Sequence, residues 1–418
     1  MPESKDPHSL TSRLHSATQV LTRGFDPRLS MGSARPAVFR SSTYVFPSPE
    51  AAERAFSIAT GRSRAAEGEN VDLIYARINH PNAEILEDHL VPLEQGAHAA
   101  AVFNSGMAAI MTALVTFAKP GDCIVYTVPV YGGTQHLIHE FLDPLGISGI
   151  AVPAGSTELL RKTIAETENV RIVFIETPAN PTMRMTDIAG AAAAAKAKPK
   201  PPLVFVDNTF LGPTFQHPLT LGADLLLYSA TKYLSGLSDM ICGAALAADE
   251  SLIATMKARR IIFGNILPPD ECWMLDNRLP TVTLRMNRAS KNAQRIAEHL
   301  AKNPKVARVH YPSLFTDPEQ VRIREAQTDF PGALFSLELS GGKQKAFDFL
   351  RHLQIAHNAV SLGGVETLVC HPKTTTHSPL TAEELATAEI TDGLIRVSVG
   401  IEDWRDLLAD FEQALKKL

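Results

Sequence analysis

The sequence lacks the features that mark membrane, secreted and nucleic-acid-binding proteins. No apolar stretch reaches the roughly 18 to 20 residues that cross a bilayer, and the N-terminus lacks the basic-then-apolar layout of a secretion signal. There is no run of basic residues, and the formal net charge is -5, which gives no electrostatic basis for binding nucleic acid. We therefore expect a soluble cytoplasmic protein with neither a membrane nor a nucleic acid as its partner.

Cysteine is also scarce. Cys123, Cys242, Cys272 and Cys370 are scattered along the chain without CxxC spacing. Zinc sites and disulfide frameworks need clustered or patterned cysteines, so we predict no metal site and no disulfide. Free cysteine packs as a small hydrophobe, and these four thiols are expected to be buried.

The length and the apolar pattern predict an α/β protein of more than one domain. The chain has 418 residues, which exceeds what one small core organises. Short apolar runs at residues 123–126, 170–175, 203–206 and 225–228 alternate with helical stretches. This pattern is typical of a mainly parallel sheet that is covered on both faces.

The pattern changes near both ends of the chain. Residues 1–72 are rich in Ser, Arg and Pro, and could not form a core alone. After about residue 283, expected helices at 288–302 and 404–417 flank an expected strand at 333–339. We predict an extended N-terminal segment (1–72), an α/β domain (73–283) and a smaller C-terminal α+β domain (284–418).

Lys232 is the strongest functional candidate. It follows the apolar run 225–228 in the sequence Ser-Ala-Thr-Lys, where small hydroxyl residues surround one lysine. A lysine amine can form a Schiff base with a carbonyl, and the hydroxyls of Ser229 and Thr231 can hydrogen-bond a phosphate. This combination points to pyridoxal phosphate as a cofactor. The alternative is that Lys232 only caps a strand and is exposed to solvent, as most lysines are.

Asp207 lies directly after the run 203–206, where ligands of open α/β sheets bind. A carboxylate there could pair with the pyridine nitrogen of the cofactor, although an aspartate at a strand end is often only a turn or cap residue. Because Asp207 ends the run that precedes the lysine segment, the cofactor interpretation is favoured.

Four further motifs suit anion or ring binding. Ser105, Gly106 and Met107 open an expected helix, whose first N–H groups can bind a phosphate. Tyr131 stands before two glycines and could stack on a ring. Tyr75 and Arg77 could hold a phosphate, and Arg396 interrupts an apolar strand-like run, where a guanidinium needs an anion such as a substrate carboxylate.

Together these motifs resemble the cysteine/methionine-metabolism family of pyridoxal-phosphate enzymes, which includes cystathionine synthases and lyases, sulfhydrylases and methionine γ-lyase. The resemblance extends from about Tyr44 to the last expected helix, and the motifs occur in the family's order. It implies the type I, aspartate-aminotransferase-like fold, pyridoxal 5'-phosphate as the cofactor and a small-molecule amino-acid substrate.

The resemblance also implies a role for each motif. Lys232 would bind the cofactor and later move protons, Asp207 would hold the pyridinium, and Tyr131 would stack on the ring and act as an acid. The phosphate would be bound by Ser105, Gly106, Met107, Ser229 and Thr231, and the substrate by Arg396, Ser361 and Asn180. Tyr75 and Arg77 would reach the phosphate of the neighbouring subunit, which implies a dimer within a homotetramer, with residues 1–72 at the contact.

Val360 bears on the choice of reaction. Relatives that handle cystathionine often carry a glutamate before the Ser-Leu-Gly sequence, whereas Val360 resembles methionine γ-lyase and removes an ion pair with a distant ammonium. Methionine γ-lyases usually carry a cysteine two residues after the stacking tyrosine, where this chain has Gly133. The Asn-Pro-Thr that is common in the family after Tyr-x-Arg is replaced by His80-Pro81-Asn82, and residues 61–70 resemble an insertion near the active-site entrance. Because of these departures from the family pattern, an oxygen-linked substrate such as canavanine or an O-acylhomoserine is a further hypothesis.

We therefore expect a carbon–sulfur or carbon–oxygen lyase that acts by γ-elimination, closest in motif to methionine γ-lyase. A γ-replacement enzyme, of the cystathionine γ-synthase or O-acylhomoserine sulfhydrylase type, is the alternative within the family. A non-catalytic binding protein that keeps the fold is the alternative from another class.

Overall fold

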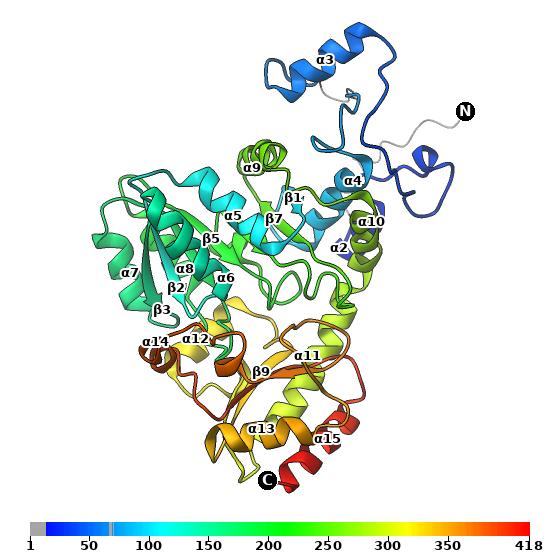
Figure 1. Ribbon diagram of the computed structural model, residues 1–418. Coiled ribbons are helices and arrows are strands. Elements are labelled where there is room, and N and C mark those ends of the chain that lie inside the picture. The colour runs from blue at the N-terminus through cyan, green and yellow to red at the C-terminus, as the bar shows by residue number, and fades with distance from the viewer. Residues whose placement is uncertain (1–13, 67–68, 70) are drawn as a thin grey trace.

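The computed structural model describes residues 14–66, 69 and 71–418 and shows two lobes with an N-terminal segment that projects from one of them (Figure 1). The helices of the described residues are α2 Ser16–Thr22, α3 Pro49–Ala59, α4 Pro81–Leu90, α5 Gly106–Phe117, α6 Gly132–His136, α7 Thr157–Glu166, α8 Ile188–Lys196, α9 Glu250–Phe263, α10 Pro269–Arg278, α11 Val282–Leu300, α12 Pro318–Gln327, α13 Gly342–His352, α14 Ala382–Thr387 and α15 Trp404–Lys416. No helix in this part of the chain combines the length and the apolar character needed to span a membrane.

The larger lobe contains a seven-stranded sheet in the order β1-β7-β6-β5-β4-β2-β3. Its strands are β1 Ala99–Phe103, β2 Cys123–Val128, β3 Ser148–Pro153, β4 Val170–Glu176, β5 Leu203–Asp207, β6 Leu225–Tyr228 and β7 Gly243–Ala247. The pairs from β6 across to β3 are parallel, whereas β7 runs antiparallel to both β6 and β1. The predicted α/β fold with a mainly parallel sheet is confirmed.

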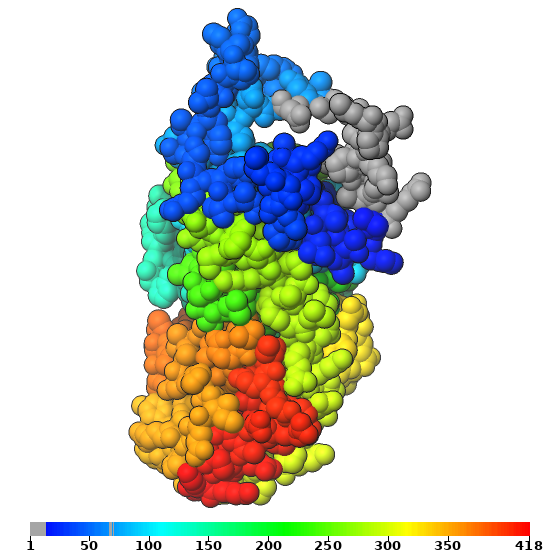
Figure 2. Space-filling model, turned by 90° about the vertical axis from the view of Figure 1, so that its right-hand side faces the viewer, coloured from blue at the N-terminus to red at the C-terminus, as the bar shows by residue number. Residues whose placement is uncertain are grey.

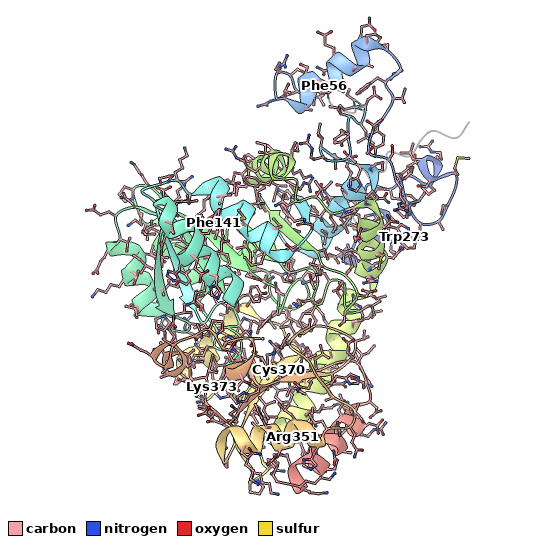
Figure 3. The ribbon with its side chains drawn as sticks, viewed as in Figure 1. Phe56, Phe141, Trp273, Arg351, Cys370 and Lys373 are labelled. Carbon is pink, nitrogen blue, oxygen red and sulfur yellow. The ribbon has the colours of Figure 1, made fainter. Side chains whose placement is uncertain are left out.

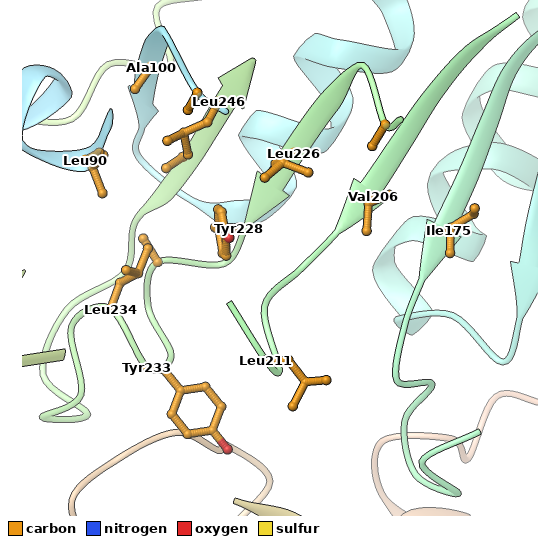
Figure 4. Close-up of a cluster of buried hydrophobic side chains, with 14 of the residues drawn as sticks. Leu90, Ala100, Ile175, Val206, Leu211, Leu226, Tyr228, Tyr233, Leu234 and Leu246 are labelled. Atoms are coloured by element: carbon orange, nitrogen blue, oxygen red, sulfur yellow. The ribbon is translucent and has the colours of Figure 1, made fainter. Parts of the chain in front are cut away.

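Both faces of this sheet are buried, as the continuous apolar runs predicted. Val204, Val206 and Leu226 face a core that includes α4, α8 and α10, and part of this core is shown in Figure 4. Phe205 and Leu225 face the opposite core, which includes α5 and α9. Successive residues of one strand point to opposite faces, so a strand that is covered on both sides must be apolar throughout.

The smaller lobe is built on a five-stranded sheet in the order β10-β11-β12-β9-β8. Its strands are β8 Val306–His310, β9 Leu334–Leu339, β10 His357–Asn358, β11 Leu368–Cys370 and β12 Leu394–Ser398. The long helix α11 joins the two lobes, because Met286 packs in a core of the large lobe and Ile296 in the core of the small one. The small lobe is the predicted C-terminal α+β unit, while the boundaries near residues 72 and 283 stay predictions.

The N-terminal segment is tied to the large lobe at a few points. Asn82 on α4 accepts a hydrogen bond from the Phe39 N–H (2.9 Å), and Trp273 on α10 donates to the Pro36 carbonyl (2.9 Å; Figure 3). Beyond these points α3 stands away from the body, with Phe56 48% exposed, and the space-filling view shows this projection at the top of the molecule (Figure 2). A surface of this kind suits contact with another chain.

Two of the sequence features that depart from the family pattern lie in or beside this segment. His80 caps α4 by accepting from the Ala83 N–H (3.2 Å), and its other ring nitrogen lies 3.0 Å from the Leu267 carbonyl oxygen. In the segment 61–70, residues 67, 68 and 70 lie outside the described part, and Glu69 pairs with Arg54 on α3 (2.7 Å). The location of residues 61–70 near an active-site entrance stays a prediction.

All four cysteines are buried and free, as the sequence predicted.

Candidate active site

A cavity of about 280 Å³ lies at the carboxyl ends of the parallel strands, and the small lobe closes one side of it. Most of the predicted site residues line it: Ser105, Gly106, Met107, Tyr131, Asn180, Asp207, Ser229, Thr231, Lys232, Val360 and Arg396. Ligands in open α/β sheets bind at this edge, where the strands end and loops with free backbone groups begin.

Lys232 follows β6 and is half-buried. Its Nζ donates a hydrogen bond to Ser361 Oγ (3.2 Å), which brings Ser361 to the site although it does not line the cavity directly. Burial, and then the nearby Arg396 guanidinium, lower the pKa of Lys232. Both effects disfavour the charged form, so the amine is better prepared to attack a carbonyl.

Asp207 ends β5 and is buried. Its Oδ1 accepts from both the N–H and the hydroxyl of Thr209 (3.1 and 2.5 Å), and that hydroxyl oxygen in turn accepts from the Ser229 N–H (2.9 Å). Thr209 thus joins the carboxylate to the segment that carries Lys232. Burial raises the pKa of Asp207, and a cation beside it would restore the ionised form.

The start of α5 lies close to the residue that follows β6. Ser105 caps the helix by accepting from the Ala108 N–H (3.0 Å), a contact typically worth about 1 kcal/mol. A Cβ on Gly106 would stand 2.9 Å from Ser229 Cα, so only glycine allows this approach. The first N–H groups of α5 have no partner within the helix and, with the Ser229 hydroxyl, form a cradle that fits a phosphate.

Thr231 lines the same cradle, but its hydroxyl is already engaged. Thr231 Oγ1 donates to the Cys242 carbonyl (3.1 Å) and accepts from the Cys242 N–H (3.0 Å). A phosphate dianion offers only acceptors, so the Thr231 hydroxyl must rotate to donate to it. In this structure Thr231 holds the lysine loop against the segment before β7.

Tyr131 precedes α6, and its side chain is 54% exposed. Its ring lies over Gly133, where a Cβ would stand 2.8 Å from Tyr131 Cε1 and 2.9 Å from Met107 Sδ. The ring thus occupies the space that a side chain at position 133 would need. This is a physical reason for glycine at that position.

Arg396 lies on β12 and is only 2% exposed. It donates to the carbonyls of Val360 and Ser361 (both 2.8 Å) and to Asn180 Oδ1 (3.4 Å), while its Nε has no partner among the described residues. A buried guanidinium with an unused N–H fits an anionic ligand such as a carboxylate. Asn180 and Arg396 come from different lobes, so the two side chains meet only when both lobes are folded and packed together.

Tyr75 and Arg77 are not brought to this cavity. Arg77 donates to the Ile261 carbonyl (2.7 Å), its guanidinium lies 5.7 Å from the centre of the Tyr75 ring, and Tyr75 is 40% exposed. Their expected place beside the phosphate of a neighbouring subunit stays a prediction.

The cavity also contains residues that sequence reasoning did not select, above all Glu176, Thr209, Thr376 and His377. Glu176 could have been found, because it ends the apolar run of β4 just as Asp207 ends that of β5. His377 and Thr376 lie in a loop of the small lobe, where no local pattern signals that the fold returns them to the strand ends. Burial, and then Arg396, lower the pKa of His377 to about 4, so this ring is neutral at physiological pH.

The comparisons with known proteins agree with this geometry. Residues 17–416 match the family model described as "Cys/Met metabolism PLP-dependent enzyme". The chain belongs to this family. It is therefore a pyridoxal 5'-phosphate-dependent enzyme, and the cavity that Lys232 and Asp207 line is the candidate site for this cofactor.

Relatives in the family are similar to this protein over most of its length. L-methionine gamma-lyase of Pseudomonas putida is 38% identical over 96% of this chain and 97% of its own length. Cystathionine beta-lyase of Bacillus subtilis is 39% identical over 82% of this chain and 86% of its own length. The crystal structure of cystathionine gamma synthase from Xanthomonas oryzae pv. oryzae in complex with cystathionine has a TM-score of 0.87 at 33% identity, and covers 97% of this chain and 98% of that one.

These findings show a pyridoxal-phosphate-dependent carbon–sulfur lyase with the type I fold that the sequence predicted, and an amino-acid substrate is consistent with the family.

Proposed function

We propose that the enzyme catalyses γ-elimination on a γ-substituted L-amino acid, in which one water is consumed and the protonated substituent, a 2-oxo acid and ammonia are released. The observation that carries the proposal is the composition of one cavity: Lys232 and Arg396 face it together with the apolar side chain of Val360. Val360 is 55% exposed, so it meets the substrate region without offering a charge. A substrate with a distant ammonium therefore gains no ion pair there, and cystathionine is disfavoured.

The bound cofactor supplies an electron sink for the charge left when a proton leaves the carbon next to the substrate amine. Asp207 would hold the ring nitrogen, and the cradle of Ser105, Gly106, Met107, Ser229 and Thr231 would hold the phosphate. Lys232, with its lowered pKa, takes the proton from Cα and then serves the proton transfer at Cβ. Arg396, Ser361 and Asn180 bind the substrate carboxylate, which fixes the Cα–H bond relative to the lysine.

Tyr131 is the proposed acid for the departing group. Tyr131 lines the cavity and is 54% exposed, and in this proposal its phenol donates a proton to the γ-substituent as the bond to Cγ breaks. Tyr131→Phe removes this proton but keeps the ring, so turnover falls by roughly a hundredfold or more while cofactor affinity changes little. Equal losses of turnover and cofactor affinity would contradict the acid role.

The leaving group includes oxygen-linked as well as sulfur-linked substituents in this proposal. Gly132 leaves the cavity wall beside Tyr131 without a side chain, and a relative named L-methionine gamma-lyase supports a sulfur-linked substrate. An oxygen-linked substrate such as canavanine places a polar atom at the same position. Both undergo the same bond cleavage at Cγ.

A substrate screen tests the proposal. Methionine, homocysteine, cystathionine, canavanine and O-acetylhomoserine are incubated singly with the loaded enzyme, and 2-oxo acid, ammonia and homoserine are measured with and without an added thiol. Elimination predicts 2-oxo acid and ammonia in equal amounts without a thiol, with cystathionine a poor substrate. Product that appears only when a thiol is present would instead favour γ-replacement, the alternative supported by the similarity to a cystathionine gamma synthase structure.

We also propose that two chains complete each site within a homotetramer. The projecting N-terminal segment and the position of Tyr75 and Arg77 outside their own cavity support this assembly. In it, each chain's Tyr75 and Arg77 bind the cofactor phosphate of the neighbour.

A further inference from the structure

A second buried carboxyl group stands beside Asp207 in the cavity. Glu176 is the last residue of β4, and the strand register pairs it with Asp207 on β5. Residues paired across neighbouring strands point to the same face, and both side chains line the cavity. Glu176 is only 5% exposed, and the proposed function gives it no role.

The two oxygens of Glu176 accept hydrogen bonds from two different loops. Oε2 accepts from the Tyr131 N–H (2.7 Å), and Oε1 accepts from the Asn180 N–H (3.4 Å). The N–H of Glu176 itself donates to Thr127 Oγ1 on β2 (3.1 Å). One carboxyl group thus fixes the loop after β2 relative to the loop after β4.

Each of these loops carries a group of the proposed site. The Tyr131 loop sets the position of the ring over Gly133, as the close approach of Tyr131 Cε1 shows. The Asn180 loop presents Asn180 Oδ1 to Arg396. A shift of the Glu176 side chain would therefore move both the stacking ring and the carboxylate-binding group.

Burying the Glu176 carboxyl group beside that of Asp207 costs free energy, and a side chain that only joined two loops would not need this position. Burial, and then the Asp207 carboxyl, raise the pKa of Glu176 to about 8. Lys232 and Arg396 are the cationic side chains that line the same cavity, and neither forms an ion pair with Glu176 among the described residues. A carboxyl group in a cleft whose pKa is raised by burial and by a second carboxyl group is common at functional sites.

We propose that Glu176 is a positioning residue of the active site, which holds the Tyr131 ring and the Asn180–Arg396 carboxylate grip in a fixed relation to each other over the cofactor. The inference rests on the proposed function, because it uses the roles assigned there to Tyr131, Asn180 and Arg396.

The test compares Glu176→Gln with Asp410→Asn in the loaded enzyme. The amide of glutamine keeps one acceptor but turns an NH₂ group toward one of the two N–H donors, so one hydrogen bond is lost. Asp410 on α15 is a matched control, since it is 4% exposed, accepts from the N–H groups of Gln354, Ile355 and Ala356, and lies in the small lobe away from the cavity. Thermal melting, visible circular dichroism of the bound cofactor, kcat and KM are measured for each.

Glu176→Gln is expected to reduce the visible circular dichroism of the cofactor and to raise KM about tenfold or more, with a smaller change in kcat. Asp410→Asn should lower the melting temperature but leave the dichroism and KM as in the wild type. If Glu176→Gln fails to fold, Glu176→Asp takes its place, because it keeps the carboxyl group but is too short to reach both loops, and the same signature is expected.

A Glu176 variant whose dichroism and KM match those of Asp410→Asn would overturn the inference. Failure of the proposed function is a separate result: the wild type would release no 2-oxo acid from any substrate of the screen. The dichroism comparison, which needs no turnover, would still report whether Glu176 positions the ring.

Discussion

At the scale of single residues, Arg396 acts on two neighbours at once. It is the guanidinium proposed to bind the substrate carboxylate, and it also contributes, after burial, to the lowered pKa of Lys232. The two effects are separable, because the first needs the planar fork of arginine and the second needs only a positive charge.

Arg396→Met removes the charge, so the pKa of Lys232 should rise and less neutral amine should be present at a given pH. The rate at which the enzyme without cofactor links to added pyridoxal phosphate, followed by absorbance across a pH series, is expected to shift to higher pH. Arg396→Lys keeps the charge, so its pH profile should stay near that of the wild type, while kcat/KM falls about tenfold or more through loss of the fork. An unshifted profile in Arg396→Met would show that burial alone sets the pKa.

Which single residues can be predicted from sequence depends on how local their signal is. Asp207 is the last residue of the apolar strand β5 and Lys232 comes four residues after the apolar strand β6, so their place near the strand ends could be read from the chain. Glu176 carries the same signal but was not selected, because its partners, the N–H groups of Tyr131 and Asn180, are set by loop conformation. His377 comes from the other lobe, and only the packing of the lobes brings it near.

At the scale of elements, the site depends on how closely α5 approaches the residue after β6. Gly106 permits the approach to Ser229, and on the far side a Cβ on Gly243, at the start of β7, would stand 2.2 Å from the Ser105 carbonyl oxygen. Two glycines from distant parts of the chain therefore allow the N-terminus of α5 to reach the proposed phosphate site.

Gly106→Ala should push α5 away from Ser229 and weaken cofactor binding by about tenfold or more, as expected for loss of charged hydrogen bonds. Titration of the enzyme without cofactor, followed by fluorescence, measures this affinity. The control is Ala108→Gly in the same turn. It costs up to about 1 kcal/mol of helix stability but adds no atom between α5 and Ser229. A larger loss of affinity in Ala108→Gly than in Gly106→Ala would mean that helix stability, not close approach, controls the cradle.

The elements that sequence reasoning placed best are those with unbroken apolar runs. The expected strand at 225–228 coincides with β6, and the expected helix at 404–417 differs from α15 by one residue. The antiparallel direction of β7 was not foreseen, because a strand's direction depends on its connection and not on its composition. Helix α11 begins six residues before the expected start at 288. Val282 and Met286 are buried in its first turns, but Leu284 between them is 69% exposed, so the apolar residues there do not mark one face of a helix.

At the scale of the whole molecule, the contacts within one chain do not explain why the N-terminal segment exposes apolar side chains. Leu29, Met31 and Val45 are 77%, 99% and 93% exposed, and Arg77 donates to the Ile261 carbonyl and does not line the cavity of its own chain. Assembly with a second chain would cover this apolar surface and give Tyr75 and Arg77 a phosphate to bind.

Mixing two inactive variants tests this arrangement. Lys232→Ala chains lack the reactive amine and Arg77→Ala chains lack the phosphate contact, so each alone should have little activity. After the two are unfolded and refolded together, a hybrid dimer contains one site with both Lys232 and a neighbour's Arg77, and up to about a quarter of wild-type activity should return if chains pair at random. No recovery, with hybrids verified by mass, would place Arg77 in the site of its own chain.

Lys232 is the centre of the account, and the direct measurement is where the cofactor becomes attached. The loaded enzyme is reduced with borohydride, digested and analysed by mass spectrometry, with Lys232→Ala and the exposed-site variant Lys119→Ala treated in parallel. We predict a cofactor adduct on the peptide that contains Lys232 in the wild type and in Lys119→Ala, and neither adduct nor 2-oxo acid formation in Lys232→Ala. An adduct on another lysine, or retained turnover in Lys232→Ala, would contradict the assignment.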